Sequence, residues 1–463
     1  MKQSRSSTDL TPSEGGPPGV QDDAQLGTQI NEKSPADADG GKAAWLFLAA
    51  CYVIEAVTFG FGFSFGVLQD YYSSHAPFQG SSSIPAIGTT TTGLMYLGTP
   101  FVLTFCRTFP RIARWLSLAG VLLCAISLAS SSFANSAPQL IGVQGVLYGL
   151  GGCIAYCPCT IYIDQWFVRR KGMAYGIVWS AAGTGGVVFP FVLQALLDAK
   201  GFRNTMRILS GVIFAISAPL TLFIRPRVPL SLPRSESRSV ADSDGSEESA
   251  GKRFSMRFAV SRRFIIHQTA NVIEAAGYFL PSIYLPTYAR ELFAASSFRS
   301  ALTSTLVNLS ATVGLVLMGL ISDRLKVTHC MLISASGTAV AVLIIWGLTP
   351  SLAVLYVFCI VYGLFAGCWA SIWPGIMREV AGKAEAEGYG RTDPVMVQGH
   401  LCIGRGVGNI VSGPLSNALV GIRAWRGQAR GGYGSGYGAL IVFTGLTAFV
   451  SGLNFIWEFL GVI

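Results

Sequence analysis

The stretch WLFLAACYVIEAVTFGFGFSFGVLQ, residues 45–69, decides the fold. It carries a single acidic residue, Glu55, and no Lys or Arg. An α-helix needs about 20 apolar residues to cross about 30 Å of hydrocarbon, and this stretch meets that need. The sequence therefore predicts a membrane-spanning helix here. Glu55 would lie about ten residues past one end of that helix, about 15 Å deep at about 1.5 Å per residue.

Further apolar runs continue along the chain and form two sets separated by a polar stretch. Together with 45–69, the first set is 84–105, 114–133, 138–163, 172–197 and 206–224, and the second is 264–289, 300–322, 330–348, 351–377, 395–420 and 437–460. Residues 225–262 between the sets are rich in Pro, Ser and charge and cannot enter a bilayer. The sequence thus predicts an all-α integral membrane protein. Twelve transmembrane helices would form two six-helix bundles, 44–224 and 263–463, joined by a cytoplasmic linker, 225–262.

The composition of the 463-residue chain excludes a water-soluble protein. Hydrophobic residues make up 51% and charged residues 12%, whereas a soluble domain has about 25% charged residues. The mean hydropathy is +0.50. Residues 1–43 are rich in Ser, Gly, Pro, Asp and Gln, have no apolar signal-peptide core, and predict a disordered cytoplasmic tail. Most of the ten cysteines lie inside apolar runs, which predicts free, buried thiols.

The net charge of +9 comes from short basic clusters between the apolar runs, not from one stripe or tail. This pattern favours membrane topology over nucleic-acid binding. Most Lys and Arg residues fall in loops that are cytoplasmic if both termini are, so we expect the N- and C-termini inside. The loop 421–436, with Arg423, Arg426 and Arg430, goes against this rule. We expect a multi-pass plasma-membrane protein, with a vacuolar or other organelle membrane as the alternative.

Two short sequence matches between the halves indicate that the halves are repeats. Val-Ile-Glu-Ala occurs at 53–56 and again at 272–275, which gives Glu55 and Glu274 the same depth in the first and seventh predicted helices. A weaker match relates Gly-Thr-Gly at 183–185, in the fifth predicted helix, to Gly-Arg-Gly at 404–406, in the eleventh predicted helix. Parallel repeats of this kind are typical of carriers whose halves are related by an axis normal to the membrane.

Three segments carry a resemblance to a known family. Asp39-Gly40-Gly41 with Trp45 precedes FGFSFGVLQDYY at 61–72, WFVRRKGMAYGIVWSAAGTGG occupies 166–186, and a Gly-x-x-x-Asp-Arg motif ends at Arg324, with Lys326 where a glycine is usual. These segments resemble the signatures of the major facilitator superfamily, and within it the monocarboxylate-porter-like family, particularly its fungal-type members. The resemblance covers about residues 39–460 and implies the twelve-helix carrier fold.

The chain departs from the animal members of that family at positions tied to substrate and proton. Those members have a lysine in the first helix and an Asp/Arg pair in the eighth, where this chain has Phe63, Ala311 and Leu315. The resemblance therefore implies a carrier without the usual anion ligand, which argues against lactate or pyruvate. Arg405, in the eleventh predicted helix, can supply a cation instead.

Three charged residues lie at mid-membrane depth: Glu55, Glu274 and Arg405. A charge there costs about 2.5–3.5 kcal/mol on insertion scales, so it usually faces a partner or a wet cavity. Our hypothesis is that Arg405 binds an anionic or polar group of the substrate and that Glu55 or Glu274 accepts a proton. The alternative is a permanent Glu–Arg pair that only holds helices together.

Two further groups complete the candidate residues. Neutral hydrogen-bonding or apolar lining of the substrate site is expected from Asn308, Asn271, Asn409 and Tyr278, and further aromatic bulk from Tyr284, Trp369 and Trp373. A latch at the cytoplasmic helix ends is expected from Arg169, Arg170, Asp323 and Arg324. The alternatives are interhelical hydrogen bonding for the first group and lipid anchoring for the second.

The sequence contains no ATP-binding loop and no nucleophile–base or metal-binding constellation. We therefore expect no enzyme, no cofactor and no metal site. The expected function is secondary active transport of a small organic solute, a monocarboxylate or related organic anion, coupled to protons and working by rocker-switch alternating access. Its expected partners are the solute, protons and the lipid bilayer, with the protein acting as a monomer. The alternatives are an efflux or facilitative carrier of a larger neutral metabolite and a transporter-like nutrient sensor.

Overall fold

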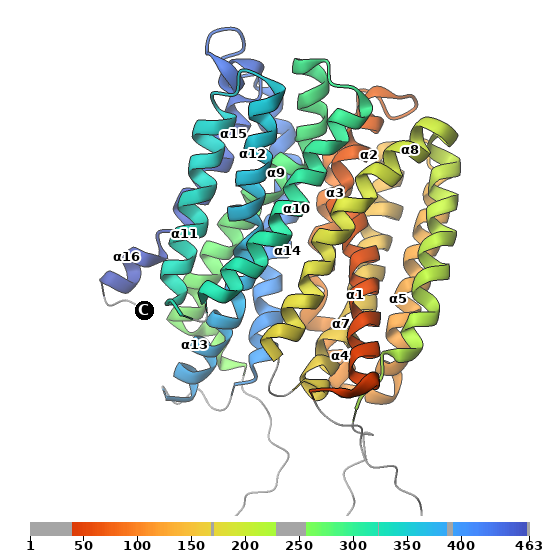
Figure 1. Cartoon of the computed structure of the whole chain (residues 1–463), viewed down its shortest axis with the longest axis vertical. Coiled ribbons are helices and arrows are strands. Elements are labelled where there is room, and N and C mark those ends of the chain that lie inside the picture. The colour runs from red at the N-terminus through yellow and green to blue at the C-terminus, as the bar shows by residue number, and fades with distance from the viewer. Residues whose placement is uncertain (1–38, 168–170, 228–255, 323, 387–391, 461–463) are drawn as a thin grey trace, which may run out of the picture. The chain divides into compact units, whose positions relative to one another are not determined.

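The computed structural model describes residues 39–167, 171–227, 256–322, 324–386 and 392–460, and these residues form helices and the turns between them. Most helices stand upright and side by side (Figure 1). The N-terminal half contains α1 (Gly41–Phe63), α2 (Phe65–Ser74), α3 (Ile84–Leu97), α4 (Thr99–Thr108), α5 (Pro110–Ser131), α6 (Ala137–Leu140), η1 (Ile141–Leu147), α7 (Tyr148–Trp166), α8 (Lys171–Leu220) and η2 (Thr221–Phe223). The C-terminal half contains η3 (Arg257–Val260), α9 (Arg262–Phe293), α10 (Ser297–Ser322), α11 (Val327–Val340), η4 (Ala341–Trp346), α12 (Leu352–Ala366), η5 (Gly367–Ile372), α13 (Trp373–Ala386), α14 (Pro394–Gly421), η6 (Gly431–Ser435), α15 (Gly438–Ser451) and α16 (Asn454–Phe459).

Each predicted apolar run is largely helical in the structure. The long helix α8 covers two runs, which separate at Gly201, where φ is 69°. In the described part of the chain, 8 helical stretches are long and apolar enough to cross a membrane. The stretches formed by α3 with α4, by α9 and by α14 are not among them, because they carry polar residues such as Thr91, Asn271 and Arg405 that are buried against other helices. The full set of twelve spans stays a prediction.

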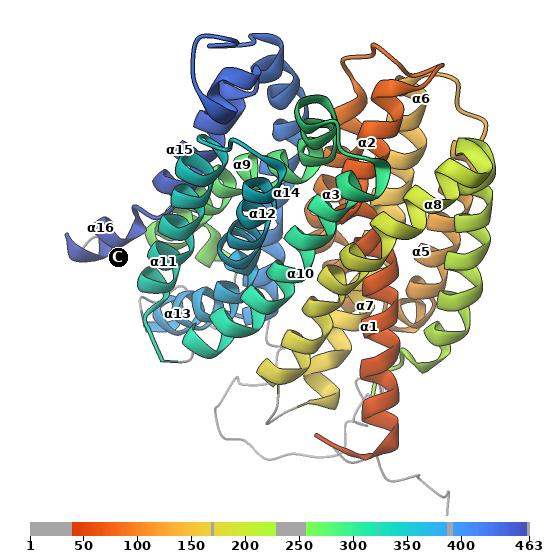
Figure 2. The ribbon, with the colours of Figure 1, turned by 45° about the horizontal axis from the view of Figure 1, so that its top comes forward.

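The two halves lie side by side and pack in a corresponding way. Figure 2 shows the helices of the N-terminal half, red to yellow, beside those of the C-terminal half, green to blue. In the first half α8 packs against α1 of its own half and against α10 of the other. In the second, α14 packs against α9 of its own half and against α3 of the other. This correspondence supports the repeat of the two halves that the short sequence matches suggest.

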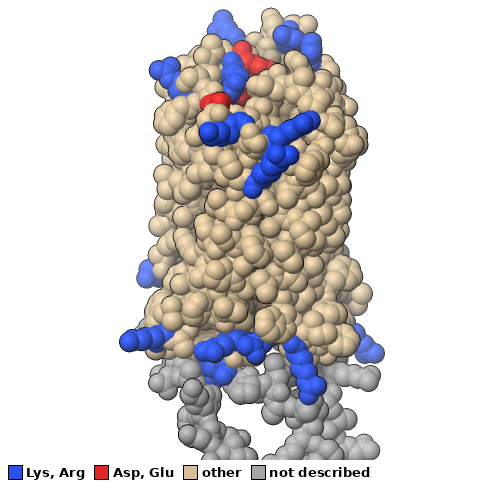
Figure 3. Space-filling view, turned by 90° about the vertical axis from the view of Figure 1, so that its right-hand side faces the viewer, with Lys and Arg blue, Asp and Glu red and all other residues tan. Residues whose placement is uncertain are grey.

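The surface divides into charged ends and an uncharged belt. On the side seen in Figure 3, Lys and Arg gather near both ends, and the band between them is almost free of charge. Large apolar side chains are exposed over the helices, among them Phe101, Ile126, Val313 and Leu320. An exposed apolar surface of this extent fits contact with lipid. All ten cysteines are unpaired and buried, as predicted.

The contact between α1 and α8 depends on two facing glycines. A Cβ atom on Gly185 would lie 2.0 Å from the carbonyl oxygen of Ala56, and one on Gly60 would lie 2.6 Å from Cα of Gly185. Both distances are far below van der Waals contact. The absence of side chains here lets the two backbones touch, which is a common way for helices to associate in membranes.

We predict that Gly185→Val destabilises the protein by at least about 1–3 kcal/mol, because the new side chain must push α8 away from α1. The matched control is Gly176→Val, also on α8, where an added Cβ meets nothing within 4 Å. The measurement is the melting temperature and the monodisperse yield of both purified variants. Equal behaviour of the two variants would show that the helices do not approach as described.

Candidate functional site

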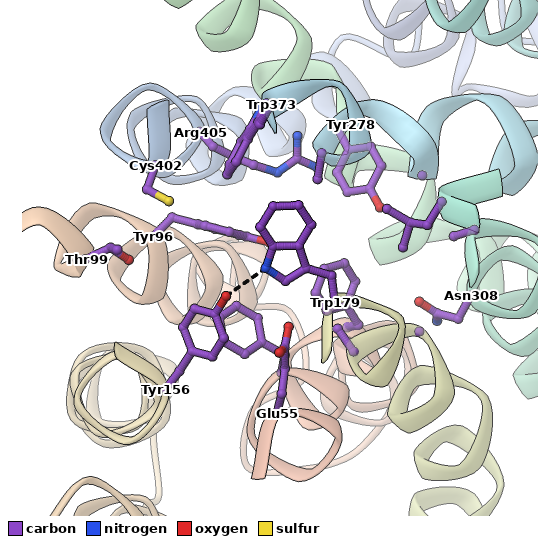
Figure 4. Close-up of a pocket in the computed structure, with 18 of the residues that line it drawn as sticks. Glu55, Tyr96, Thr99, Tyr156, Trp179, Tyr278, Asn308, Trp373, Cys402 and Arg405 are labelled. Carbon is purple, nitrogen blue, oxygen red and sulfur yellow. Dashed lines mark hydrogen bonds between the residues drawn. The ribbon is translucent and has the colours of Figure 1, made fainter. Parts of the chain in front are cut away.

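A cavity lies between the two halves near the middle of the helices. It contains about 750 Å³ of space free of protein atoms, including its open side. Residues from both halves line it, on α1, α3, α4, α7 and α8 of the first half and on α9, α10, η5, α13 and α14 of the second. Figure 4 shows Arg405, Tyr278 and Trp373 on one side of the cavity and Glu55 and Tyr156 on the other. Volumes of about 300–1,000 Å³ are typical of small-molecule sites.

Arg405 is the cation among the described residues that line this cavity. Its Nη1 donates to Oε2 of Glu274 at 2.8 Å, and the residue is only 3% exposed. The guanidinium carbon lies 4.3 Å from the ring centre of Tyr278 and 5.7 Å from that of Tyr96. Stacking on aromatic faces stabilises a desolvated guanidinium beyond its ion pair. Within the described residues the Nε atom has no hydrogen-bond partner, so one donor is left over.

The two glutamates of the sequence repeat have different surroundings. Glu274 does not line the central cavity. It forms an ion pair with Arg405 and lines a second, smaller cavity. Glu55 lines the cavity, is 4% exposed, and has one carboxyl oxygen, Oε2, without a partner in the described part of the chain. One carboxyl therefore neutralises the cation, and the other faces the space where a solute would lie.

Aromatic side chains form most of the remaining wall. The indole nitrogen of Trp179 donates to the hydroxyl of Tyr156 at 2.8 Å, which joins α8 to α7 (Figure 4). The ring of Phe59 lies edge-on to both Tyr96 and Tyr156, with centres 5.7 and 5.3 Å apart. Such edge contacts hold large rings in fixed orientations. The cavity thus combines a broad apolar surface with few polar groups.

Contacts between the two halves lie along the helices on both sides of the cavity. Near α2, which lies toward the upper face of Figure 1, Asp70 of α2 pairs with Arg290 of α9 at 2.8 Å. Phe63 at the end of α1 packs on Phe279 of α9. Toward the lower face, Tyr96 packs edge-on to Trp373 at 6.4 Å. Arg107 of α4 also forms an ion pair with Asp393, the N-cap residue of α14.

Comparison with known proteins assigns the family. The profile of the Major Facilitator Superfamily matches residues 78–390. The chain belongs to the major facilitator superfamily. It is 31% identical to the MFS-type transporter pytF of Aspergillus terreus over 65% of this chain and 97% of that protein. This confirms the superfamily and the fungal-type resemblance, and it makes the protein a superfamily transporter.

Other proteins match more of this transporter at lower identity. The aspyridones efflux protein apdF of Emericella nidulans is 26% identical over 76% of this chain and 68% of that protein. Monocarboxylate transporter 10 of Mus musculus is 25% identical over 79% of this chain and 72% of that protein. The solved structure of the nucleoside transporter NupG superposes with a TM-score of 0.62 at 16% identity, over 89% of this chain and 100% of that one. The last comparison establishes the fold alone.

The transporter's cavity includes some predicted site residues and leaves out others. Glu55, Arg405, Tyr278 and Asn308 line it, and so do Phe63, Ala311 and Leu315, which replace the usual ionic ligands with apolar groups. Asn271 lies outside it, since its amide donates to the carbonyl of Leu401 and accepts from Trp369. Asn409 is fully buried on α14 and does not line it either. Among the aromatic candidates, Trp373 lines the cavity, and Tyr284 and Trp369 do not.

The predicted latch lies largely outside the described residues, which include Arg324 but not Arg169, Arg170 or Asp323. Sequence reasoning missed the ion pairs Asp70–Arg290 and Arg107–Asp393, and it missed Trp179 and Tyr156 in the wall. Trp179 falls inside 166–186, one of the three segments that carry the family resemblance, and that was a usable signal for it. The ion pairs had no such signal, because their partners are far apart in sequence.

We predict that Glu274→Ala destabilises the transporter by about 3–5 kcal/mol, because it leaves the buried Arg405 charge without its partner. Glu55→Gln loses no partner and should change stability by less than about 1 kcal/mol. The measurement is the free energy of unfolding in mixed micelles titrated with SDS. Replacing both members of the pair, Glu274→Gln with Arg405→Gln, should recover stability relative to Glu274→Ala. Equal costs for the two single variants would contradict the unequal roles of the glutamates.

Proposed function

We propose that this transporter is a secondary carrier for an organic solute with an aromatic or otherwise apolar body and one anionic group. The observation that carries the proposal is the buried Arg405, stacked on Tyr278 in a cavity that both halves line. A cation that a solute can reach in an apolar cavity is suited to a carboxylate. The solute would be carried by rocker-switch alternating access, with the inter-half contacts at the two faces opening in turn.

The aromatic wall favours a solute larger than lactate or pyruvate. Trp179, Tyr156 and Phe59 offer flat apolar faces, and Phe63 stands where a lysine is usual in the animal members. Binding a two- or three-carbon acid would leave much of this surface uncovered. An aromatic monocarboxylate covers it and still reaches Arg405 with its carboxylate.

We infer coupling to protons from the pairing of Arg405 with Glu274. An anionic solute must compete with Glu274 for the same guanidinium, since the pair is buried and in contact at 2.8 Å. A proton on Glu274 removes its negative charge and leaves Arg405 to the solute. Proton and anion then bind together, which is the requirement for symport. Glu55 would offer the solute a hydrogen bond from the opposite side, as Asn308 would from α10.

The membrane arrangement proposed with this function has twelve spans, both termini in the cytoplasm, and a monomeric carrier in the plasma membrane. The clustering of basic residues in the loops on the side of the N-terminus supports this orientation. In that orientation the lower face of Figure 1 is cytoplasmic, and Arg324 would contribute there to a latch with Arg169, Arg170 and Asp323.

Efflux of a larger neutral metabolite is the second candidate. Two observations favour it: the name of the relative apdF, an aspyridones efflux protein, and the low density of polar groups in the cavity. In this case Arg405 would stay paired with Glu274 throughout the cycle, and the aromatic wall would supply most of the binding energy.

Transport by purified protein in proteoliposomes tests these alternatives. With pyruvate, phenylpyruvate and a neutral aromatic amide as probes, we expect uptake of phenylpyruvate, and much weaker uptake of the other two. Arg405→Ala should lower the apparent affinity for phenylpyruvate at least about 30-fold, the cost of removing one partner of a buried charge pair. Arg405→Lys, which keeps the charge, should lose less. Preferential uptake of the amide, unaffected by Arg405→Ala, would favour the second candidate.

Replacing Glu274 and replacing Glu55 should have different effects on proton coupling. We predict that Glu274→Gln abolishes accumulation of phenylpyruvate driven by a pH gradient while exchange at equal pH persists, because the titrating carboxyl is gone. Glu55→Gln should keep the response to the pH gradient and change only the apparent affinity. Rates of both processes, at matched protein density, provide the measurement. Accumulation by Glu274→Gln at the unaltered rate would rule out Glu274 as the proton acceptor.

A further inference from the structure

The central cavity is lined by several buried polar atoms that have no hydrogen-bond partner in the described part of the chain. They are Nε of Arg405, Nε1 of Trp373, Oε2 of Glu55 and Oε1 of Gln398. None of these residues is more than 4% exposed. Buried polar atoms are almost always satisfied by protein or by ordered water. Atoms of this kind around one cavity therefore indicate which groups a bound solute has to supply.

These atoms divide into donors and acceptors. The N–H groups of Arg405 and Trp373 donate, whereas the amide oxygen of Gln398 and an ionised carboxylate oxygen of Glu55 accept. A carboxylate and a ketone only accept, so an acid such as phenylpyruvate can satisfy the two donors and leaves both oxygens unsatisfied. Leaving a buried acceptor unsatisfied is costly. A solute that also carries an O–H or N–H group should therefore fit this cavity better.

One of the two acceptors lies on the same wall as Arg405. Gln398, Cys402 and Arg405 are spaced by four and three residues on α14, and all three line the cavity. Seven residues separate Gln398 from Arg405, which is about 10 Å along the helix axis at about 1.5 Å per residue. Glu55 lies on the opposite side of the cavity from Arg405 (Figure 4). A flat solute that binds Arg405 through a carboxylate and extends along α14 therefore presents its other end to Gln398.

The surroundings of Gln398 favour a hydroxyl group over an ammonium group on the solute. Trp373 begins α13, which packs against α14, and its indole N–H also lacks a partner among the described residues. A hydroxyl group donates and accepts, so it suits both the oxygen of Gln398 and the N–H of Trp373. An ammonium group only donates, and the amide of Gln398 carries no charge that would neutralise it.

We propose that Gln398 determines specificity by accepting a hydrogen bond from a hydroxyl group at the end of the solute remote from its carboxylate. The preferred solutes are then aromatic acids whose ring carries a hydroxyl group opposite the side chain with the carboxylate. The ring lies against the aromatic wall between Gln398 and Arg405. This inference rests on the proposed function for the carboxylate end of the solute, whereas the contact with Gln398 does not involve Arg405.

Binding of three related acids to the purified protein, measured by calorimetric titration, tests the hydroxyl contact. 4-Hydroxyphenylpyruvate should bind about fivefold more tightly than phenylpyruvate, because a buried acceptor gains a donor. 4-Methoxyphenylpyruvate has an oxygen at the same place but no O–H group, so it should bind no more tightly than phenylpyruvate. Equal affinities for 4-hydroxyphenylpyruvate and phenylpyruvate would overturn the proposal, and so would a methoxy compound that binds as tightly as the hydroxylated acid.

Substitutions at Gln398 assign the contact to that residue. Gln398→Met removes the acceptor, so the advantage of the hydroxylated acid should fall below about twofold while phenylpyruvate keeps its affinity within about twofold. Gln398→Glu keeps an acceptor oxygen and should keep the advantage. The matched control is Gln69→Met, since Gln69 is also buried with Oε1 unpartnered among the described residues but does not line the cavity. A persistent advantage in Gln398→Met would overturn the proposal, and so would an equal loss of both acids, which would mean a packing role.

Two neutral probes, 4-hydroxyphenylacetamide and phenylacetamide, distinguish failure of this inference from failure of the proposed function. They differ in the hydroxyl group and carry no carboxylate. If neither acid binds, the anion carrier fails and the amides decide the role of Gln398. The hydroxylated amide should then bind about fivefold more tightly, an advantage that is lost in Gln398→Met and kept in Arg405→Ala. Equal affinities for the two amides, or no binding of either, would in that case overturn the role of Gln398.

Discussion

The ion pair between Glu274 and Arg405 is the constraint on which the rest of the structure depends. Two full charges lie near the middle of a bundle whose outer surface is apolar, and neither is tolerable there alone. Their contact makes Arg405 available at the edge of a cavity without the cost of an unpaired ion. The stacking of Arg405 on Tyr278 and Tyr96 fixes where the guanidinium points. The cavity wall thus holds one guanidinium in a fixed orientation.

The pair also explains why the helices that carry it differ from the others. The helices α9 and α14 are too polar to qualify as spans by hydropathy, and they lie where the halves meet. Helices such as α5 and α12 have apolar outer faces and provide the surface that contacts lipid. The ion pairs Asp70–Arg290 and Arg107–Asp393 join the two halves on either side of the cavity. In the proposed cycle, breaking a few of these polar contacts would open one face while the lipid-facing surface stays the same.

The sequence was sufficient for the helices and for the central charges, and the reason is physical. A hydrophobic run of the right length indicates a membrane-spanning helix directly. A charged residue within such a run is rare, so Glu55, Glu274 and Arg405 could be identified as candidate site residues from their depth alone. The depth of a residue in the membrane does not indicate the direction in which its side chain points. Asn271 and Asn409 have suitable depths, yet their helix faces turn them away from the cavity. Trp179 and Tyr156 were missed because an aromatic residue in a membrane helix is most often a packing group.

In the proposed mechanism, binding of an anion and protonation of Glu274 are one linked event. Calorimetric titration of the purified protein with phenylpyruvate, in buffers of different ionisation enthalpy, measures the protons taken up per molecule bound. At a pH above the range in which Glu274 is already protonated, we expect the unaltered chain to take up about one proton per molecule bound. We expect no proton uptake by Glu274→Gln. Binding without proton uptake at any pH, or equal uptake by the two proteins, would contradict this mechanism.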